Sequence, residues 1–202
     1  MKCAAIGIRM HSGWGVLLGV SGAAHSVEIM DRRRIVIIDP AVAGAAQPYH
    51  YAASLGLTAM GLAESERHLA SCAAVSGRLA LAAVGELVRE LDGRNYHIVG
   101  SAVLLASGRP LPSLSKILAA HPLIHTAEGE FFRHAVSQAC ESLKIPVLAI
   151  RERDLEERAK TVFGTGSGQM RRRIASLGSS IGPPWTKDHK AAALAAAIVL
   201  AR

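Results

Sequence analysis

The hydrophobic pattern at the start of the chain predicts a β-meander. Residues 3–8 and 15–20 are short apolar runs separated by a polar, glycine-containing stretch, which predicts two antiparallel strands joined by a turn. Residues 25–38 predict a third strand region, either continuous or broken at 31–34. Three successive strands with short connections therefore open the fold.

After this meander, helical and strand patterns alternate. Residues 39–51 contain two prolines and predict a loop, whereas 54–91 contains no proline and has apolar residues at helical spacing. That spacing predicts one long helix, or two that meet near residues 76 and 77. The continuously apolar run 97–106 predicts a buried central strand. Further helices are predicted at 113–120, at 124–143, from 154 onward and at 187–201. A further strand is predicted at 146–150, and a flexible glycine-rich turn at 164–168.

This order of elements predicts one α/β domain over residues 1–202. Three antiparallel strands are followed by two strands that are reached through helical crossovers. Such an order gives a mixed five-stranded sheet with helices on both faces. Asp154, with Glu157 three residues later, predicts a capping pair at the start of the helix from 154 onward.

Composition limits the function classes without selecting one. Half of the residues are hydrophobic, which is enough to form a buried core. The net charge of +7 would permit the protein to bind phosphate groups or an acidic partner. Three widely spaced cysteines in apolar surroundings predict reduced, buried thiols and a cytoplasmic location. Arg9 ends the first apolar run before it is long enough for the apolar region of a secretory signal peptide. The alanine-rich segment at the end of the chain is about half as long as a membrane-spanning helix. We therefore expect no export and no membrane anchoring.

Motifs at the two ends of the chain carry a family resemblance. Gly7-Ile8-Arg9 is followed by the turn Ser12-Gly13-Trp14-Gly15-Val16, and the glycine-rich segment 162–169 leads into three arginines. Lys187-Asp188-His189 then heads an alanine-rich helix. In this order, the motifs resemble those of the RuvC-type Holliday-junction resolvases of the ribonuclease H-like superfamily. The resemblance implies a ribonuclease H-like sheet, and homodimerisation through the helix at 54–91.

The resemblance also implies four metal-ligating positions, and most of them are lost. Arg9 stands where the first aspartate is expected, and the segment 99–105 contains no acid at the second position. A gapless match places His189 and Ala192 at the last two positions, with Asp188 one residue out of register. A guanidinium cannot ligate a metal, so the residues argue against two-metal cleavage. We expect no cofactor; the alternative is Mg²⁺ or Mn²⁺ in a rewired site, with Asp188 and His189 as the catalytic candidates.

The same residues suggest an anion-binding face. The candidate ligand-binding residues are Arg9, His11, Ser12, Arg171, Arg172 and Arg173, together with the basic run Arg32–Arg34. They could contact a phosphate backbone. Alternatively, the arginines are simply solvated, and a polar rim remains that an Arg9–Asp188 ion pair stabilises. This second interpretation predicts that the Arg9 and Asp188 side chains lie close together.

A separate candidate metal group lies near the start of a predicted helix. Glu128 and Glu130 stand close in sequence to His125 and His134, and His and Glu at helical spacings can converge on a cation. Acids in a first helical turn are also expected from the helix dipole alone. Glu128, Asp188 and His189 are thus the candidate metal ligands.

These observations favour a catalytically inactive ribonuclease H-like protein that binds nucleic acid or another anionic partner. A first alternative is a metal-dependent nuclease whose rewired site uses Asp188, His189 and Glu28 or Glu128. A second is a protein-interaction scaffold without a nucleic-acid role. The sugar-kinase and actin branch of the superfold also begins with a strand-turn-strand hairpin, but 202 residues leave no room for its second lobe.

Overall fold

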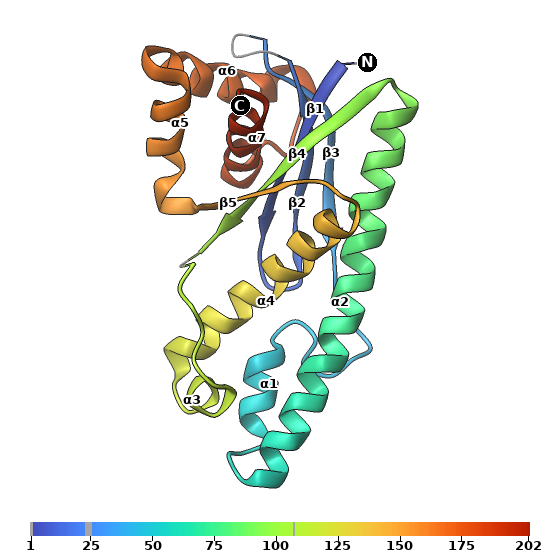
Figure 1. Ribbon diagram of the computed structural model, residues 1–202, viewed down its shortest axis with the longest axis vertical. Helices are drawn as coiled ribbons and strands as arrows, with labels where there is room; N and C mark the ends of the chain where they lie inside the picture. The colour runs from blue at the N-terminus through green and yellow to red at the C-terminus, as the bar shows by residue number, and fades with distance from the viewer. Residues whose placement is uncertain (1, 23–25, 107) are drawn as a thin grey trace.

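Five strands form one sheet in the order β3-β2-β1-β4-β5. The computed structural model describes residues 2–22, 26–106 and 108–202; His25 and Ser107, which begin a predicted strand region and a predicted loop, lie outside the described residues. Figure 1 shows the two termini at the same end of the molecule. The strands are β1 (Lys2–Met10), β2 (Trp14–Ser21), β3 (Glu28–Val36), β4 (Tyr96–Leu105) and β5 (Val147–Arg151).

The pairing of the strands confirms the predicted mixed sheet. β1, β2 and β3 are antiparallel neighbours, and Arg9 of β1 lies opposite Val16 of β2. β4 runs parallel to β1 and places Leu104 beside Arg9, and β5 runs parallel to β4. The carboxyl ends of β1, β4 and β5 therefore meet at one edge of the sheet, where parallel α/β sheets commonly place ligands.

Helices cover both faces of the sheet, as predicted. α7 packs with α5 and α6 on one face, and α2 and α4 pack on the other. Alternation along β1 assigns its residues to these layers: Ala5 belongs to the α7 core, whereas Ile6 and Ile8 belong to the α2–α4 core. The α-helices are α1 (Pro48–Ser54), α2 (Ala59–Gly93), α3 (Leu114–Leu118), α4 (His121–Ser142), α5 (Leu155–Phe163), α6 (Ser167–Ile181) and α7 (Lys187–Leu200).

The structure corrects two local predictions and decides between the two alternatives for the third strand region. The predicted loop at 39–51 runs into α1, which begins at Pro48 because a proline at the first helical position loses no hydrogen bond. β3 continues through Asp31–Arg34 without a break. Asp154 makes no side-chain cap; its carboxylate pairs with Arg151 instead, and a 3₁₀ turn (Glu152–Asp154) precedes α5. The glycine-rich segment forms a second 3₁₀ turn (Gly164–Gly166) between α5 and α6.

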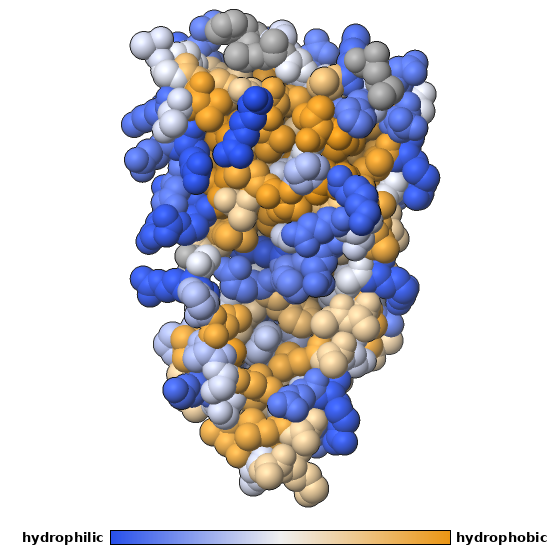
Figure 2. Space-filling model, in the orientation of Figure 1, coloured by the Kyte–Doolittle hydropathy of each residue, from blue (hydrophilic) through white to orange (hydrophobic). Residues whose placement is uncertain are grey.

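A helical extension reaches beyond the sheet. Figure 1 shows α1, α3 and the N-terminal parts of α2 and α4 together past the ends of β1 and β4. Two small apolar clusters hold this end together, with Ala52 of α1, Leu118 of α3 and Ala127 of α4 among their buried residues. In Figure 2 hydrophobic side chains are also visible on the surface of this end. The extension thus lies beyond the sheet edge at which the carboxyl ends of β1 and β4 meet.

α2 is long and apolar enough to cross a membrane by length and composition alone. Its residues Val84, Leu87 and Leu91 are completely buried against the sheet and α4. Core helices pass the same test of length and composition, so this property of α2 is weak evidence for a membrane span.

The cysteines differ in accessibility, which gives a first prediction. Cys72 and Cys140 are buried, as predicted, but Cys3 is exposed because it lies near the open start of β1. Burial raises the pKa of Cys140 to about 11 and also raises the pKa of Cys72. At pH 8 we expect iodoacetamide to alkylate Cys3 in the native protein and to leave Cys140 unmodified, as measured by peptide mass spectrometry. Denatured protein is the control; native labelling of Cys140 at the rate of Cys3 would contradict this.

Candidate functional site

Arg9 is the centre of an ion-pair network at the carboxyl end of β1. Its side chain is 15% exposed and donates hydrogen bonds to Asp188 in the first turn of α7 and, over 3.0 Å, to Glu152 after β5. This contact confirms the predicted proximity of Arg9 and Asp188. One guanidinium therefore joins two carboxylates from elements that are more than a hundred residues away in the sequence.

His11 completes the coordination of Asp188. Its Nε2 lies 2.8 Å from the second carboxylate oxygen of Asp188 and 2.9 Å from a guanidinium nitrogen of Arg9. The imidazole stacks on Trp14 with 4.3 Å between ring centroids, and Arg34 lies over the Trp14 ring. Both oxygens of Asp188 thus already have protein partners.

Glu152 has a second basic partner, Arg133 of α4. An Arg133 nitrogen lies 3.8 Å from Glu152, and the same guanidinium donates to the carbonyl oxygens of Leu104 and Gly129. Burial lowers the pKa of Arg133 from its ordinary value, while Glu130 and Glu152 oppose that effect. Arg133 ties the ends of β4 and α4 to the Arg9 network.

The donor set does not fit a two-metal centre. Such a centre needs several carboxylates with oxygens free to bridge two hard cations. Here Asp188 is paired with Arg9 and His11, and Glu152 is paired with Arg9 and Arg133. β4 contributes no acid between Tyr96 and Leu105. The Arg9 guanidinium therefore pairs with both carboxylates of this site.

His189, a candidate ligand from the sequence, points away from this network. Its Nδ1 accepts a 2.8 Å hydrogen bond from the Thr186 hydroxyl and one from the Thr186 backbone N–H, which forms a capping box. Burial, then the charge of Arg32, lower the pKa of His189. Asp188, rather than His189, is the residue of this helical turn that faces β1.

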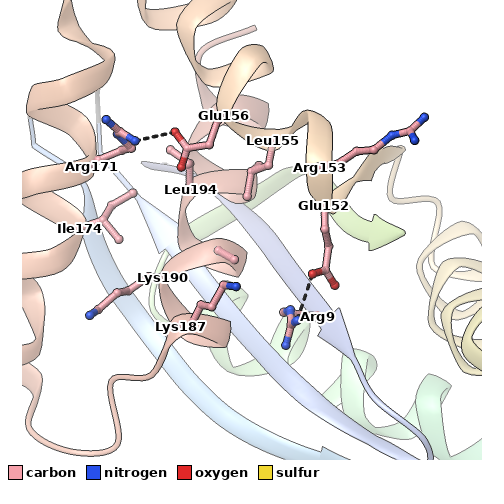
Figure 3. A pocket seen from close by; sticks show the side chains of 11 residues that line it. Arg9, Glu152, Arg153, Leu155, Glu156, Arg171, Ile174, Lys187, Lys190 and Leu194 are labelled. Carbon is pink, nitrogen blue, oxygen red and sulfur yellow. Dashed lines mark hydrogen bonds and ion pairs between the residues drawn. The ribbon is translucent and has the colours of Figure 1, made fainter. Parts of the chain in front are cut away.

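A cavity of about 500 Å³ opens beside the Arg9 network, between α5, α6 and α7. Figure 3 shows Leu155, Ile174 and Leu194 in its interior and charged side chains around its rim. Arg171 pairs with Glu156 across 2.8 Å, and Arg9 pairs with Glu152. The basic residues that line the cavity are Arg9, Arg153, Arg171, Lys187 and Lys190, against the two acids Glu152 and Glu156. The cavity is therefore suited to an anion.

The two arginine runs have different surroundings. Arg32 donates to the carbonyl oxygens of Gly182 and Pro184, and Arg33 pairs with Asp31 and Glu90. These contacts hold β3 to its neighbours and leave that run poorly placed to follow a phosphate backbone. In contrast, α6 exposes its arginines to solvent, and these residues are Arg171, Arg172 and Arg173. Ser12 is exposed in the turn after β1.

Glu128 lies outside this site. It is only 3% exposed and binds His50 of α1, which belongs to the helical extension. Glu130 accepts a hydrogen bond from the backbone N–H of Gly108 instead. The structure therefore separates Glu128 from Asp188 and His189, with which it was grouped as a candidate ligand.

Comparison with solved structures identifies the architecture. A structure of RuvC from Thermus thermophilus matches with a TM-score of 0.50 and 13% identity, over 96% of this chain and 91% of that one. The chain has a RuvC-like ribonuclease H fold. A second structure, T. thermophilus RuvC in complex with a Holliday junction substrate, matches with a TM-score of 0.47 and 14% identity, over 98% and 92% of the two chains. No family model and no curated protein matches the chain.

Within this RuvC-like fold, sequence reasoning missed Glu152 and Arg133. A signal for Glu152 was present, because it directly follows the strand β5, whose carboxyl end lies at the same edge as that of β4. Arg133 carried no such signal, since a mid-helix arginine is usually solvated. Only the packing of α4 on β4 brings its guanidinium to the Leu104 carbonyl.

Proposed function

We propose that this protein uses the former catalytic face of a RuvC-like fold to bind a nucleic-acid backbone without cutting it. The observation that carries the proposal is the position of Arg9 between Asp188 and Glu152, where its positive charge substitutes for a metal. A guanidinium cannot activate water or stabilise a leaving oxygen by coordination, as Mg²⁺ does. The face keeps its shape and loses the groups that cleavage requires.

The charges around the cavity support phosphate as the ligand. Lys187 and Lys190 are exposed and stand one turn apart at the start of α7, with Arg171 on the facing helix. Lysine and arginine in such an arrangement can replace the counterions condensed on a phosphate backbone. The resemblance to junction resolvases makes branched DNA the first probe to use.

Homodimerisation through α2 is part of this proposal. Met60 and Leu81 of α2 are exposed, at 79% and 40%. A second copy would cover such side chains and would place two basic faces on one assembly.

Reversing the charge of the two lysines tests the binding face. We expect Lys187→Glu/Lys190→Glu to raise the Kd for labelled branched DNA about tenfold and to reduce the slope of log K against log salt by about 2. The matched control is Lys2→Glu/Arg202→Glu, which changes the net charge equally at exposed positions, Lys2 being at the opposite end of β1. Gel shifts at two salt concentrations measure both quantities. Equal losses in the two double variants would refute a localised site.

Incubation with branched and linear DNA in Mg²⁺ or Mn²⁺ tests the absence of cleavage. We expect intact DNA with salt-sensitive shifts. Cutting by the wild type that disappears in Asp188→Asn would instead establish a nuclease with a rewired site. No cutting and no shift would favour a scaffold whose partners are proteins.

A further inference from the structure

Three histidines converge at the helical extension, away from the Arg9 network. His121 and His125 stand one turn apart at the start of α4, and His50 comes from α1. Among the described residues, each of these three offers a ring nitrogen, and the nitrogens lie within 4.8 Å of one another. The ring centroids of His121 and His125 are 4.4 Å apart, and that of His50 lies 4.8 Å from His125.

Glu128 orients one of these histidines. Its carboxylate lies 2.8 Å from His50 Nδ1 and accepts the His50 backbone N–H over 3.1 Å. When the His50 Nδ1–H donates its hydrogen bond to this buried carboxylate, the proton stays on Nδ1 and the lone pair of His50 Nε2 is free. This carboxylate–histidine pairing is the usual outer support of histidines that bind transition metals.

We propose that His50, His121 and His125 form a binding site for Zn²⁺, with Glu128 as the supporting carboxylate. Neutral imidazoles suit Zn²⁺, and three of them leave a fourth position for water or another ligand. Tetrahedral geometry with Zn–N bonds near 2.0 Å needs nitrogens about 3.3 Å apart. His121 and His125 are exposed, so rotation of their side chains can close the present separation.

The site would join α1 to α4. His50 belongs to a helix of seven residues, whereas His121 and His125 belong to a helix of 22 residues that packs on the sheet. A bound Zn²⁺ would therefore fix the short helix to the longer one. This inference is independent of DNA binding, because its residues are distinct from the basic residues at the Arg9 cavity.

Titration of metal-free, tag-free full-length protein with Zn²⁺ tests the site. Calorimetry should show one strong site per chain, and saturating Zn²⁺ should raise the unfolding midpoint. Glu128→Gln should weaken binding about 10–100-fold. His121→Ala/His125→Ala should weaken it at least as much, whereas His134→Ala, an exposed histidine further along α4, should bind as the wild type does.

Unfolding midpoints in EDTA show whether each variant is folded. If Glu128→Gln fails to fold, the double variant at the exposed His121 and His125 decides the question by itself. Visible absorption of the Co²⁺ form should report a four-coordinate site with histidine ligands in the wild type and in His134→Ala, and should not report it in the His121→Ala/His125→Ala variant. An absence of Zn²⁺ binding, or binding that the double variant keeps unchanged, would overturn the inference.

Discussion

Gly7→Ala should lower the free energy of unfolding by about 3 kcal/mol or more, the upper end of the cost of overpacking a core. A Cβ atom on Gly7 would lie 2.0 Å from the backbone oxygen of Ala192 and 2.7 Å from its carbonyl carbon. Because the obstacle is helix backbone rather than a flexible side chain, α7 itself would have to move. Urea denaturation measures the loss.

The effect should also reach the Arg9 network. Asp188 lies one helical turn before Ala192, and Arg9 lies two residues after Gly7 on the same face of β1. A shift of α7 therefore separates the Arg9 and Asp188 side chains. The matched control is Gly77→Ala in α2, where a Cβ meets nothing within 4 Å and where we expect a gain of about 0.5–1 kcal/mol. Equal unfolding midpoints for the two variants would show that the close approach at Gly7 does not matter.

Arg9→Ala should cost about 2–3 kcal/mol, which is about 4–12 °C in the midpoint of thermal unfolding. Removal of the guanidinium leaves Asp188 and Glu152, at 20% and 33% side-chain exposure, facing a site without its central cation. Partial exposure keeps the cost below that of a fully buried pair. Arg9→Lys, which keeps the charge but not the forked geometry, should lose less.

The same variant tests whether the guanidinium substitutes for a metal. With Arg9 removed, the two carboxylates become available to a hard cation, so Mn²⁺ should raise the unfolding midpoint of Arg9→Ala more than that of the wild type. The control is Arg153→Ala, which removes an exposed arginine of the same cavity and should change stability by less than about 0.5 kcal/mol. A Mn²⁺ response as large in the wild type as in Arg9→Ala would contradict the interpretation of Arg9.

Much of the architecture was predictable because local signals agree with the final contacts. The continuously apolar run 97–106 became β4, an interior strand of the sheet whose residues from Gly100 to Leu104 are buried. The absence of proline from 54–91 predicted the long helix α2, which is one continuous helix but begins five residues later than predicted, at Ala59, and ends at Gly93. The short helix α1 was not predicted, because a turn rich in glycine and proline precedes it and seven residues carry too little periodicity.

The sequence by itself determined the order of elements, predicted the proximity of Arg9 to Asp188, and has an arginine where the resemblance implies a metal-ligating aspartate. These follow from hydrophobic periodicity, from residue chemistry and from motifs that occur in a recognisable order. Tertiary structure alone decided that Glu152 and Arg133 join that network and that His189 caps α7. It also decided that His50 meets His121 and His125. Such contacts depend on which helix faces converge across distant parts of the chain, and local pattern does not encode that convergence.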